Sequence, residues 1–242
     1  MQDFTGIGEK LKRAKENIGN LYLEMQRFFE ESDYPFIPEH DREMLRKATE
    51  YHANRAIPPR FSVLAGETIH HFRSCLDHVV WHFSDPGKVK DIRRIEFPVF
   101  LKEPLSSDER RRFEGKIEGI TDPNVRGLIK RFQPYKATDP TDDPLCLIHD
   151  FDIFDKHREL VVCVATTAIV LPSEMREILE IYQREHSELS PAQVAHHFKS
   201  DSAARFCISF RNFGQRGVKS VSEGLIELFN YTFTMLDEFR NI

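Results

Sequence analysis

Apolar residues recur at helical spacing in the stretch from Phe61 to Phe83, FSVLAGETIHHFRSCLDHVVWHF. Steps of three and four residues place one set on a single helix face. That set is Phe72, Leu76, Val79, Val80 and Phe83. Two prolines precede the stretch and Asp-Pro-Gly follows it at 85–87, which are typical start and stop signals. The pattern predicts a long helix over about 60–84 with one face in the core.

Three other stretches predict helices that pack along the first. The segment at about 5–31 has the stripe Ile7, Leu11, Ala14, Ile18, Leu21, Met25 and Phe28. The segment at about 218–240 has the stripe Val221, Leu225, Leu228, Thr232, Met235 and Phe239. The segment at about 145–158 has Leu147, Phe151 and Phe154 on its core side. Stripes of this spacing are typical of a helical bundle, so the two terminal helices should contact each other and the central helix.

Shorter segments predict a small antiparallel sheet. Residues 160–171 (LVVCVATTAIVL) are rich in β-branched side chains, and residues 205–211 alternate like a strand. Residues 44–57 are interpreted as an edge strand. The fold class is therefore mainly α in the α+β sense, with a four-helix bundle-like core and a small antiparallel sheet. Residues 1–242 are expected to form a single domain, in which the proline-rich segment 85–145 is an excursion packed on the helical core.

Composition narrows the function classes. A formal net charge of −5 gives no general attraction to nucleic acid or to an anionic membrane. The four cysteines are widely spaced and form no C-x-x-C pair, which argues against a disulfide framework and fits a reducing cytoplasm. The first ten residues lack the apolar run of a signal peptide, and residues 160–171 are too short to span a bilayer. The expectation is a cytoplasmic protein that contacts no membrane.

Two polar clusters interrupt the predicted helices. The first, HHFRSCLDHVVWH at 70–82, carries a histidine-rich stripe and, on the opposite shoulder, Arg73 and Asp77. The second is HDFDIFDKHR at 149–158. Each has a structural explanation, because Arg73–Asp77 and Asp152–Lys156 are i,i+4 ion pairs, and cations are favoured at a helix C-terminus. If Phe72 and Leu76 share a core with the second helix, the two clusters should meet.

The chain resembles a family of uncharacterised bacterial proteins. The resemblance is carried by GETIHHFRSCLDH at 66–78, FQPY at 132–135 and LIHDFDIFDKHR at 147–158, which are similar to that family's "lhnLRSaLDHl" and "DKHR" blocks. The segment RSCLDH also resembles the R-x-x-x-x-H signature of the HEPN superfamily, which are helical, dimeric, metal-independent ribonucleases and toxins. In that signature a polar residue commonly follows the arginine, and Ser74 stands at this place.

The resemblance implies a metal-independent endoribonuclease of a stress or defence system, with RNA as partner and no cofactor. Arg73 would stabilise the phosphate and His78 would be the general acid or base, while Asp77, Lys156 and His157 would orient or assist. Five residues separate Arg73 from His78, so the two side chains point roughly 140° apart on a straight helix. Both would reach one phosphate only across a twofold axis, which makes a homodimer a requirement of this hypothesis.

Two alternatives stay open. The first is a metal-dependent hydrolase in which His71, His78 and His82 bind zinc or a di-metal centre, together with Asp152, Asp155 or His149. The sequence HVVWH lacks the central glutamate of the zinc-protease motif. The second is a non-catalytic interaction module in which the polar clusters hold the helices together. Burial separates the hypotheses, because a fully paired Arg73 and His78 with no cleft beside them would favour the interaction module.

Overall fold

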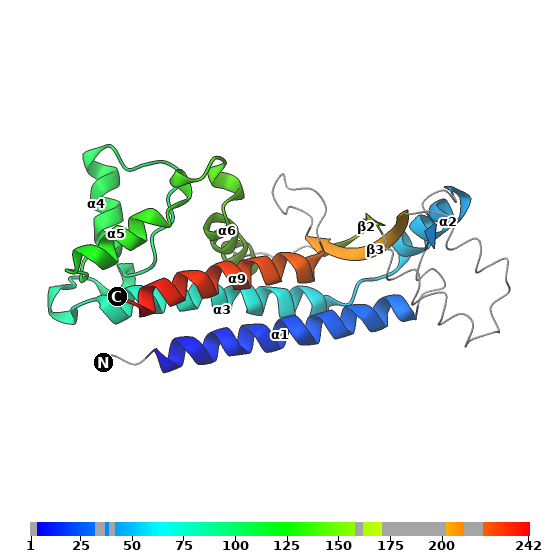
Figure 1. Ribbon diagram of the computed structural model, residues 1–242, viewed down its shortest axis with the longest axis horizontal. Helices are drawn as coiled ribbons and strands as arrows, with labels where there is room; N and C mark the ends of the chain where they lie inside the picture. Colours follow the sequence, from blue (N-terminus) through cyan, green and yellow to red (C-terminus); the bar gives the residue numbers. More distant parts are fainter. Residues whose placement is uncertain (1–3, 32–36, 39–41, 158–161, 171–201, 211–219) are drawn as a thin grey trace.

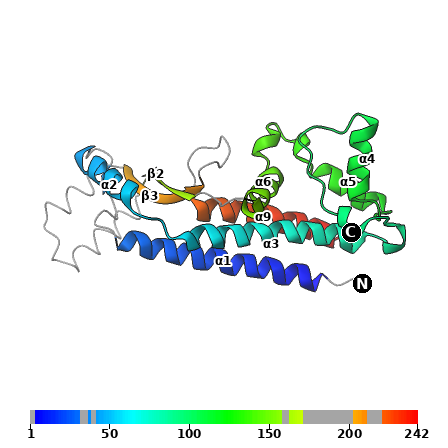
Figure 2. The same cartoon turned by 180° about the vertical axis from the view of Figure 1, so that it is seen from behind.

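The computed structural model describes residues 4–31, 37–38, 42–157, 162–170, 202–210 and 220–242. Three long helices form its centre: α1 (Thr5–Glu30), α3 (Pro59–Phe83) and α9 (Val221–Arg240). All three are in mutual contact, and α3 lies between the other two in both views (Figure 1 and Figure 2). A fourth helix, α6 (Pro144–His157), crosses α3 and α9. The mainly helical fold and the contact between the terminal helices are confirmed.

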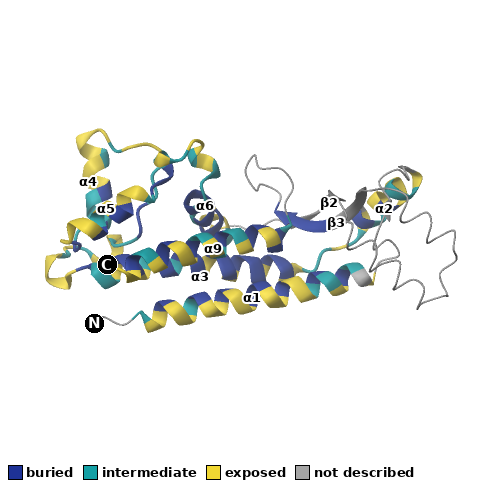
Figure 3. Ribbon diagram, viewed as in Figure 1, coloured by how far each residue is buried: buried dark blue, intermediate teal, exposed yellow. Residues whose placement is uncertain are grey.

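The apolar stripes of the two terminal helices account for this packing. Every residue of the stripes predicted on α1 and α9 is buried. At one end of the α1–α3 contact the rings of Phe28 and Phe61 are 5.7 Å apart, and at the other end Phe4 and His82 are 4.4 Å apart. The two helices therefore stay in contact along their length and run in opposite directions. Because α3 has neighbours on several sides, it is dark over much of its length in the burial view (Figure 3).

Three strands form an antiparallel sheet near the start of α9, on the side of the molecule where α1 ends (Figure 1). They are β1 (Ile37–Pro38), β2 (Val162–Val170) and β3 (Ser202–Phe210), and β3 is central. Strands β2 and β3 pair over their full length, from Val162 opposite Phe210 to Val170 opposite Ser202. The predicted strands are confirmed at 162–170 and 205–210, and the remaining residues of the predicted ranges 160–171 and 205–211 lie outside the described residues.

The strand predicted at 44–57 is wrong, because most of this segment is helix α2 (Arg42–Asn54). Two i,i+4 ion pairs lie along it, Arg46–Glu50 at 2.5 Å and Lys47–Glu43 at 2.9 Å. Pairs at this spacing stabilise a helix, whereas in a strand the same residues would lie on one face about 13 Å apart, too far to pair. The third place in the sheet is taken instead by β1.

Residues 85–145 connect α3 to α6 through short elements. These are η1 (Pro86–Lys88), η2 (Ile92–Arg94), α4 (Ser107–Lys116), α5 (Pro123–Arg131), η3 (Pro134–Lys136) and η4 (Pro140–Asp142). Phe97 of this segment packs edge-on against Phe239 of α9, and its buried residues belong to the same core as the long helices. The single-domain organisation over 1–242 stays a prediction.

None of the helices in the described ranges is long and apolar enough to cross a bilayer.

Candidate functional site

The residues of the first polar cluster, together with Gly66, contact three different parts of the molecule. Gly66 and His70 lie against α6, and Arg73 and Asp77 lie against residues 96–97. The histidine-rich stripe, which is His71, Cys75, His78 and His82, contacts α1 through Cys75 and His82. The first two pairs follow one another at steps of four, three and four residues, so they form one continuous line on the helix. The segment that packs against each pair determines its burial and its hydrogen bonds.

A histidine–carboxylate pair joins α3 to α6. The Nδ1 atom of His70 lies 2.9 Å from Oδ1 of Asp152, whose side chain is only 4% exposed, while the His70 side chain is 51% exposed. The other carboxylate oxygen of Asp152 accepts a hydrogen bond from Lys156 at 2.5 Å. An ionised carboxylate only accepts, so Nδ1 carries the proton and Nε2 is the basic nitrogen of the neutral ring. His70 is thus oriented by a buried group and open to solvent.

Asp155 lies beside this pair, and its carboxylate occupies the space next to Gly66 of α3. A Cβ atom at Gly66 would stand 2.1 Å from Oδ1 of Asp155. Burial, followed by the neighbouring Asp152 charge, raises the pKa of Asp155 above its ordinary value. Gly66, His70, Asp152, Asp155 and Lys156 together are called the His70 cluster below.

The second part of the line is closed. Arg73 is 3% exposed, and its Nη2 donates to the carbonyl of Phe97 at 2.9 Å and lies 2.8 Å from Oδ1 of Asp77. That same oxygen of Asp77 accepts the amide of Phe97 at 2.8 Å. Glu96 lies 3.4 Å from Nη2 and is also paired with Lys116. These five residues, called the Arg73 cluster below, fasten the segment 96–97 to α3.

Electrostatics in the Arg73 cluster follow from burial. Burial is the main cause that raises the pKa of Asp77, against the opposing pull of Arg73. Burial also acts on Glu96, but the hydrogen bond and charge of Lys116, helped by Arg73, hold its pKa below the ordinary value. Nη1 of Arg73 is buried and has no hydrogen-bond partner among the described residues. The guanidinium group of Arg73 therefore binds residues of this chain, and it is too buried to contact a phosphate.

His78 lies on another face of α3 and is exposed. Arg73 and His78 therefore point in different directions, as their spacing predicts, because one is buried and the other exposed. Within one chain they do not line the same site. His157 is exposed at the end of α6, and Arg158 lies outside the described residues.

The histidine stripe does not gather metal ligands. His82 packs edge-on against the rings of Phe4 and Phe83. Within the ranges that the structure describes, no group of three or more His, Cys, Asp or Glu side chains is arranged to hold a metal ion. The alternative based on His71, His78 and His82 has no geometric support.

The predicted meeting of the two polar clusters occurs, through different residues. Phe72, Leu76 and Phe151 share one core, whereas Phe154 is 41% exposed. The polar contacts to α6 are made by Gly66 and His70, nearer the start of α3 than Arg73 and His78. His70 was missed as a candidate although it opens the first cluster. Its spacing from Gly66 and Arg73 places His70 on the same line, but the partner that distinguishes it, Asp152, lies on another helix and gives no signal in the local sequence.

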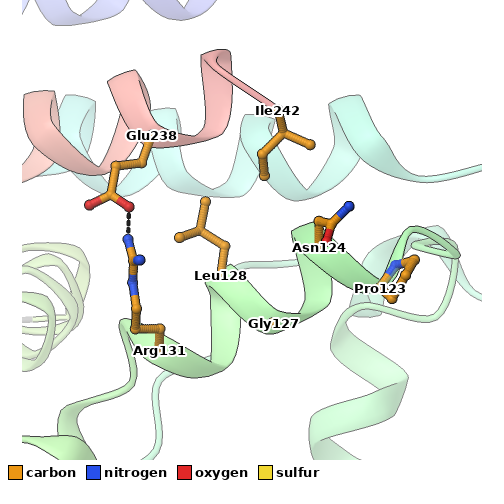
Figure 4. Close-up of a pocket in the computed structure, with 7 residues that line it drawn as sticks. All are labelled: Pro123, Asn124, Gly127, Leu128, Arg131, Glu238 and Ile242. Atoms are coloured by element: carbon orange, nitrogen blue, oxygen red, sulfur yellow. Dashed lines mark ion pairs between the residues drawn. The ribbon is translucent and has the colours of Figure 1, made fainter.

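A groove of about 390 Å³ lies elsewhere, between α5 and the last turns of α9 (Figure 4). Arg131 and Glu238 form an ion pair at its rim, and Leu128 and Ile242 supply apolar surface. Its lining includes no polar residue of α3 or α6, so it is separate from the His70 cluster.

Comparison with known proteins gives no relative: no protein-family model, no curated protein and no solved structure matches this chain.

Proposed function

We propose that this chain is a metal-independent endoribonuclease whose proton-transfer group is His70. The observation that carries the proposal is the exposed His70 ring, held at Nδ1 by the buried carboxylate of Asp152. A carboxylate in this position fixes the tautomer and the direction of an imidazole in many acid–base sites. The likeness of RSCLDH to the HEPN signature supports RNA as the substrate class.

The chemistry needs a base for the ribose 2′-hydroxyl and an acid for the leaving oxygen. His70 Nε2 takes the proton of the 2′-hydroxyl, the 2′-oxygen attacks the adjacent phosphorus, and the bond from phosphorus to the 5′-oxygen breaks. Water supplies the proton of the leaving 5′-oxygen, and Asp155, whose pKa burial raises above its ordinary value, lies near His70. The products are a 2′,3′-cyclic phosphate and a 5′-hydroxyl end. Lys156 holds the second oxygen of Asp152 and places a positive charge beside the reacting group.

The residues first proposed take other roles in this scheme. Arg73 and Asp77 position the backbone at Phe97, and His157 is an exposed side chain at the end of α6. The homodimer was required to bring Arg73 and His78 to one phosphate, and it stays a prediction of that arrangement. A cytoplasmic location and a stress or defence setting belong to the same proposal.

A cleavage assay with EDTA tests the proposal. The purified chain should cleave single-stranded RNA when divalent metals are chelated, and His70→Gln should lower the rate by about 10²–10⁴-fold. His78→Ala is the matched comparison, since it removes an exposed histidine from the same helix. If His78→Ala abolishes cleavage and His70→Gln does not, the centre lies at His78.

A second function, the non-catalytic interaction module, is favoured by the burial of Arg73. In this hypothesis both clusters only hold α3, α6 and the segment 96–97 together. Wild-type protein that cleaves no RNA with or without divalent metal would remove the ribonuclease proposal and leave this one.

A further inference from the structure

The ring of His70 has the arrangement of a nucleophile as well as that of a base. Its Nδ1 proton is held by Asp152 at 2.9 Å, so the unshared electron pair of the neutral ring lies on Nε2. The side chain is 51% exposed, and Nε2 has no hydrogen-bond partner among the residues that the structure describes. An electron pair that can take a proton from solvent can also form a bond to an electrophilic atom.

Other histidines near His70 lack this arrangement. His78 on α3 and His157 on α6 are also exposed, but neither ring is ion-paired with a carboxylate within the described ranges. His71, whose ring lies 6.5 Å from that of His70, has a buried Nδ1 atom without a hydrogen-bond partner in the described part of the chain. The fold therefore fixes the tautomer and the direction of the ring at His70 and leaves those of His78 and His157 free.

The buried carboxylate stabilises the product of a bond at Nε2. When Nε2 bonds to an electrophile, Nδ1 keeps its proton and the neutral ring becomes a cation. That cation lies against Asp152, whose side chain is only 4% exposed. Because opposite charges attract more strongly where water is excluded, Asp152 favours the modified ring over the free one.

The groups around the ring favour an anionic electrophile. Lys156 donates to the second oxygen of the Asp152 carboxylate at 2.5 Å, so its ammonium group lies on the same side of α6 as the His70 ring. Asp152 uses one of the three ammonium protons, and the Lys156 side chain is 49% exposed, which leaves protons for the oxygens of a phosphoryl group. Asp155 is the opposing charge, and burial raises its pKa and so favours its neutral form.

An acyl group suits the His70 cluster less well than a phosphoryl group. The carbonyl oxygen of an acyl donor becomes an oxyanion, which needs fixed N–H donors. His70 lies in the middle of α3, where the backbone N–H groups are used by the hydrogen bonds of the helix. A phosphoryl group spreads its charge over three oxygens and is stabilised by a neighbouring cation such as Lys156.

We infer that Nε2 of His70 accepts a phosphoryl group from a phosphoramidate donor, and that this modification switches off the proposed base. Nε2 attacks the phosphorus, the P–N bond of the donor breaks, and the protonated donor nitrogen leaves as an amine with the electron pair of that bond. The bond formed is of the same type as the bond broken, so the transfer needs no other source of energy. The regulatory part rests on the proposed function, because a phosphorylated Nε2 has no electron pair left for the 2′-hydroxyl proton.

Incubation of the full-length protein with phosphoramidate tests the acceptor. The wild-type protein should gain one phosphoryl group by intact-mass spectrometry, and phosphorus NMR should place it on Nε2 of a histidine. His70→Gln should gain none, whereas His78→Gln, the matched control on the same helix, should be labelled like the wild type. Lys156→Gln should lower the labelling rate by about threefold to tenfold, because a donor to the phosphoryl oxygens is lost.

Asp152→Asn tests the role of the buried carboxylate. The label at His70 is divided by the label at His78 in the same molecules, because unfolding would make the two histidines alike and is thereby recognised. In the wild type this ratio should be well above one, and Asp152→Asn should lower it by about tenfold or more while circular dichroism shows a folded protein. A folded Asp152→Asn protein with the wild-type ratio contradicts the assigned role of Asp152.

Equal labelling of His70 and His78 in the wild type, or wild-type labelling of His70→Gln, overturns the inference. RNA cleavage is then measured on the labelled protein before and after hydroxylamine, which removes phosphoryl groups from histidine. Cleavage that is lost on labelling and restored by hydroxylamine supports the regulatory part, and cleavage that labelling leaves unchanged overturns it. If His70 is labelled in a protein that never cleaves RNA, the acceptor stands and the regulatory part fails together with the proposed function.

Discussion

The Arg73 cluster and the His70 cluster lie one turn apart on α3, and each pairs a basic side chain of that helix with carboxylates, yet they differ in what covers them. Arg73 is enclosed by the backbone of Phe97 and by two carboxylates, and its side chain is 3% exposed. His70 contacts a single buried carboxylate on α6 and remains 51% exposed. The segment after η2 therefore closes one cluster, while α6 orients the other and leaves it open.

This difference shows that neighbouring charged residues on one helix can have different roles: one cluster stabilises the fold, and the other presents a reactive group to solvent. In the Arg73 cluster each charge has a partner within the fold, so removal of one leaves the others uncompensated. In the His70 cluster both oxygens of the buried Asp152 carboxylate have partners, one in His70 and the other in Lys156. The Nε2 atom of His70 has no hydrogen-bond partner among the residues that the structure describes. The predictions that follow set the two clusters against each other.

The largest expected effect on stability is at Arg73. Arg73→Met should lower the free energy of unfolding by about 3–5 kcal/mol, because Asp77 and the carbonyl of Phe97 lose a buried donor. His70→Gln should change it by only about 1 kcal/mol, since the glutamine amide can still donate to Asp152 and Lys156 keeps the other carboxylate oxygen. Urea denaturation of both variants measures the contrast. Equal losses in the two variants would remove the distinction between a closed and an open cluster.

An intermediate effect is expected at Gly66. An added methyl group would overlap the Asp155 carboxylate, and this end of a side chain must turn away from α3 to make room. The displacement takes Asp155 out of the His70 cluster, so Gly66→Ala should be less stable than the same change at an open helix position. Gly19→Ala on α1 is the control, because nothing lies within 4 Å of its added Cβ. Thermal unfolding should show a lower melting temperature for Gly66→Ala than for Gly19→Ala.

A smaller effect, dependent on pH, is expected at Asp155. Burial and the Asp152 charge raise its pKa above the ordinary 3.8, so the folded state favours the protonated carboxyl. The resulting stability is present below the ordinary pKa and is lost as pH rises through the folded-state value. Asp155→Asn should thus be the more stable protein at pH 7, and the gap should close toward pH 4. A gap that is absent at pH 7, or that widens on acidification, contradicts the raised pKa.

Much of the fold could be predicted because the long helices carry uninterrupted stripes. The seven positions from Ile7 to Phe28 and the six from Val221 to Phe239 are all buried, since a regular stripe has only one way to face a core. The segment 44–57 was predicted wrongly as a strand because its apolar stripe is sparse, and i,i+4 ion pairs favour the helix that the structure shows. Phe154 was expected in the core and is exposed, because α6 crosses α3 rather than running along it.

The candidate site could be predicted only in part. The sequence identified both polar clusters and their meeting, since Phe72, Leu76 and Phe151 belong to one core. It could not identify His70, because the partner that distinguishes His70 from the other histidines is Asp152, 82 positions away in the chain. The same holds for Arg73, whose closure depends on the backbone at Phe97 and not on its own helix.

Chemical rescue tests most directly the claim that His70 transfers the proton. RNA cleavage by His70→Ala should be measured in EDTA with increasing free imidazole, which can occupy the vacated space beside Asp152. Imidazole without protein and Arg73→Lys with imidazole are the controls. The account predicts a rate that rises with imidazole concentration in His70→Ala alone. A folded His70→Ala protein that retains wild-type activity, or that gains none from imidazole, would contradict it.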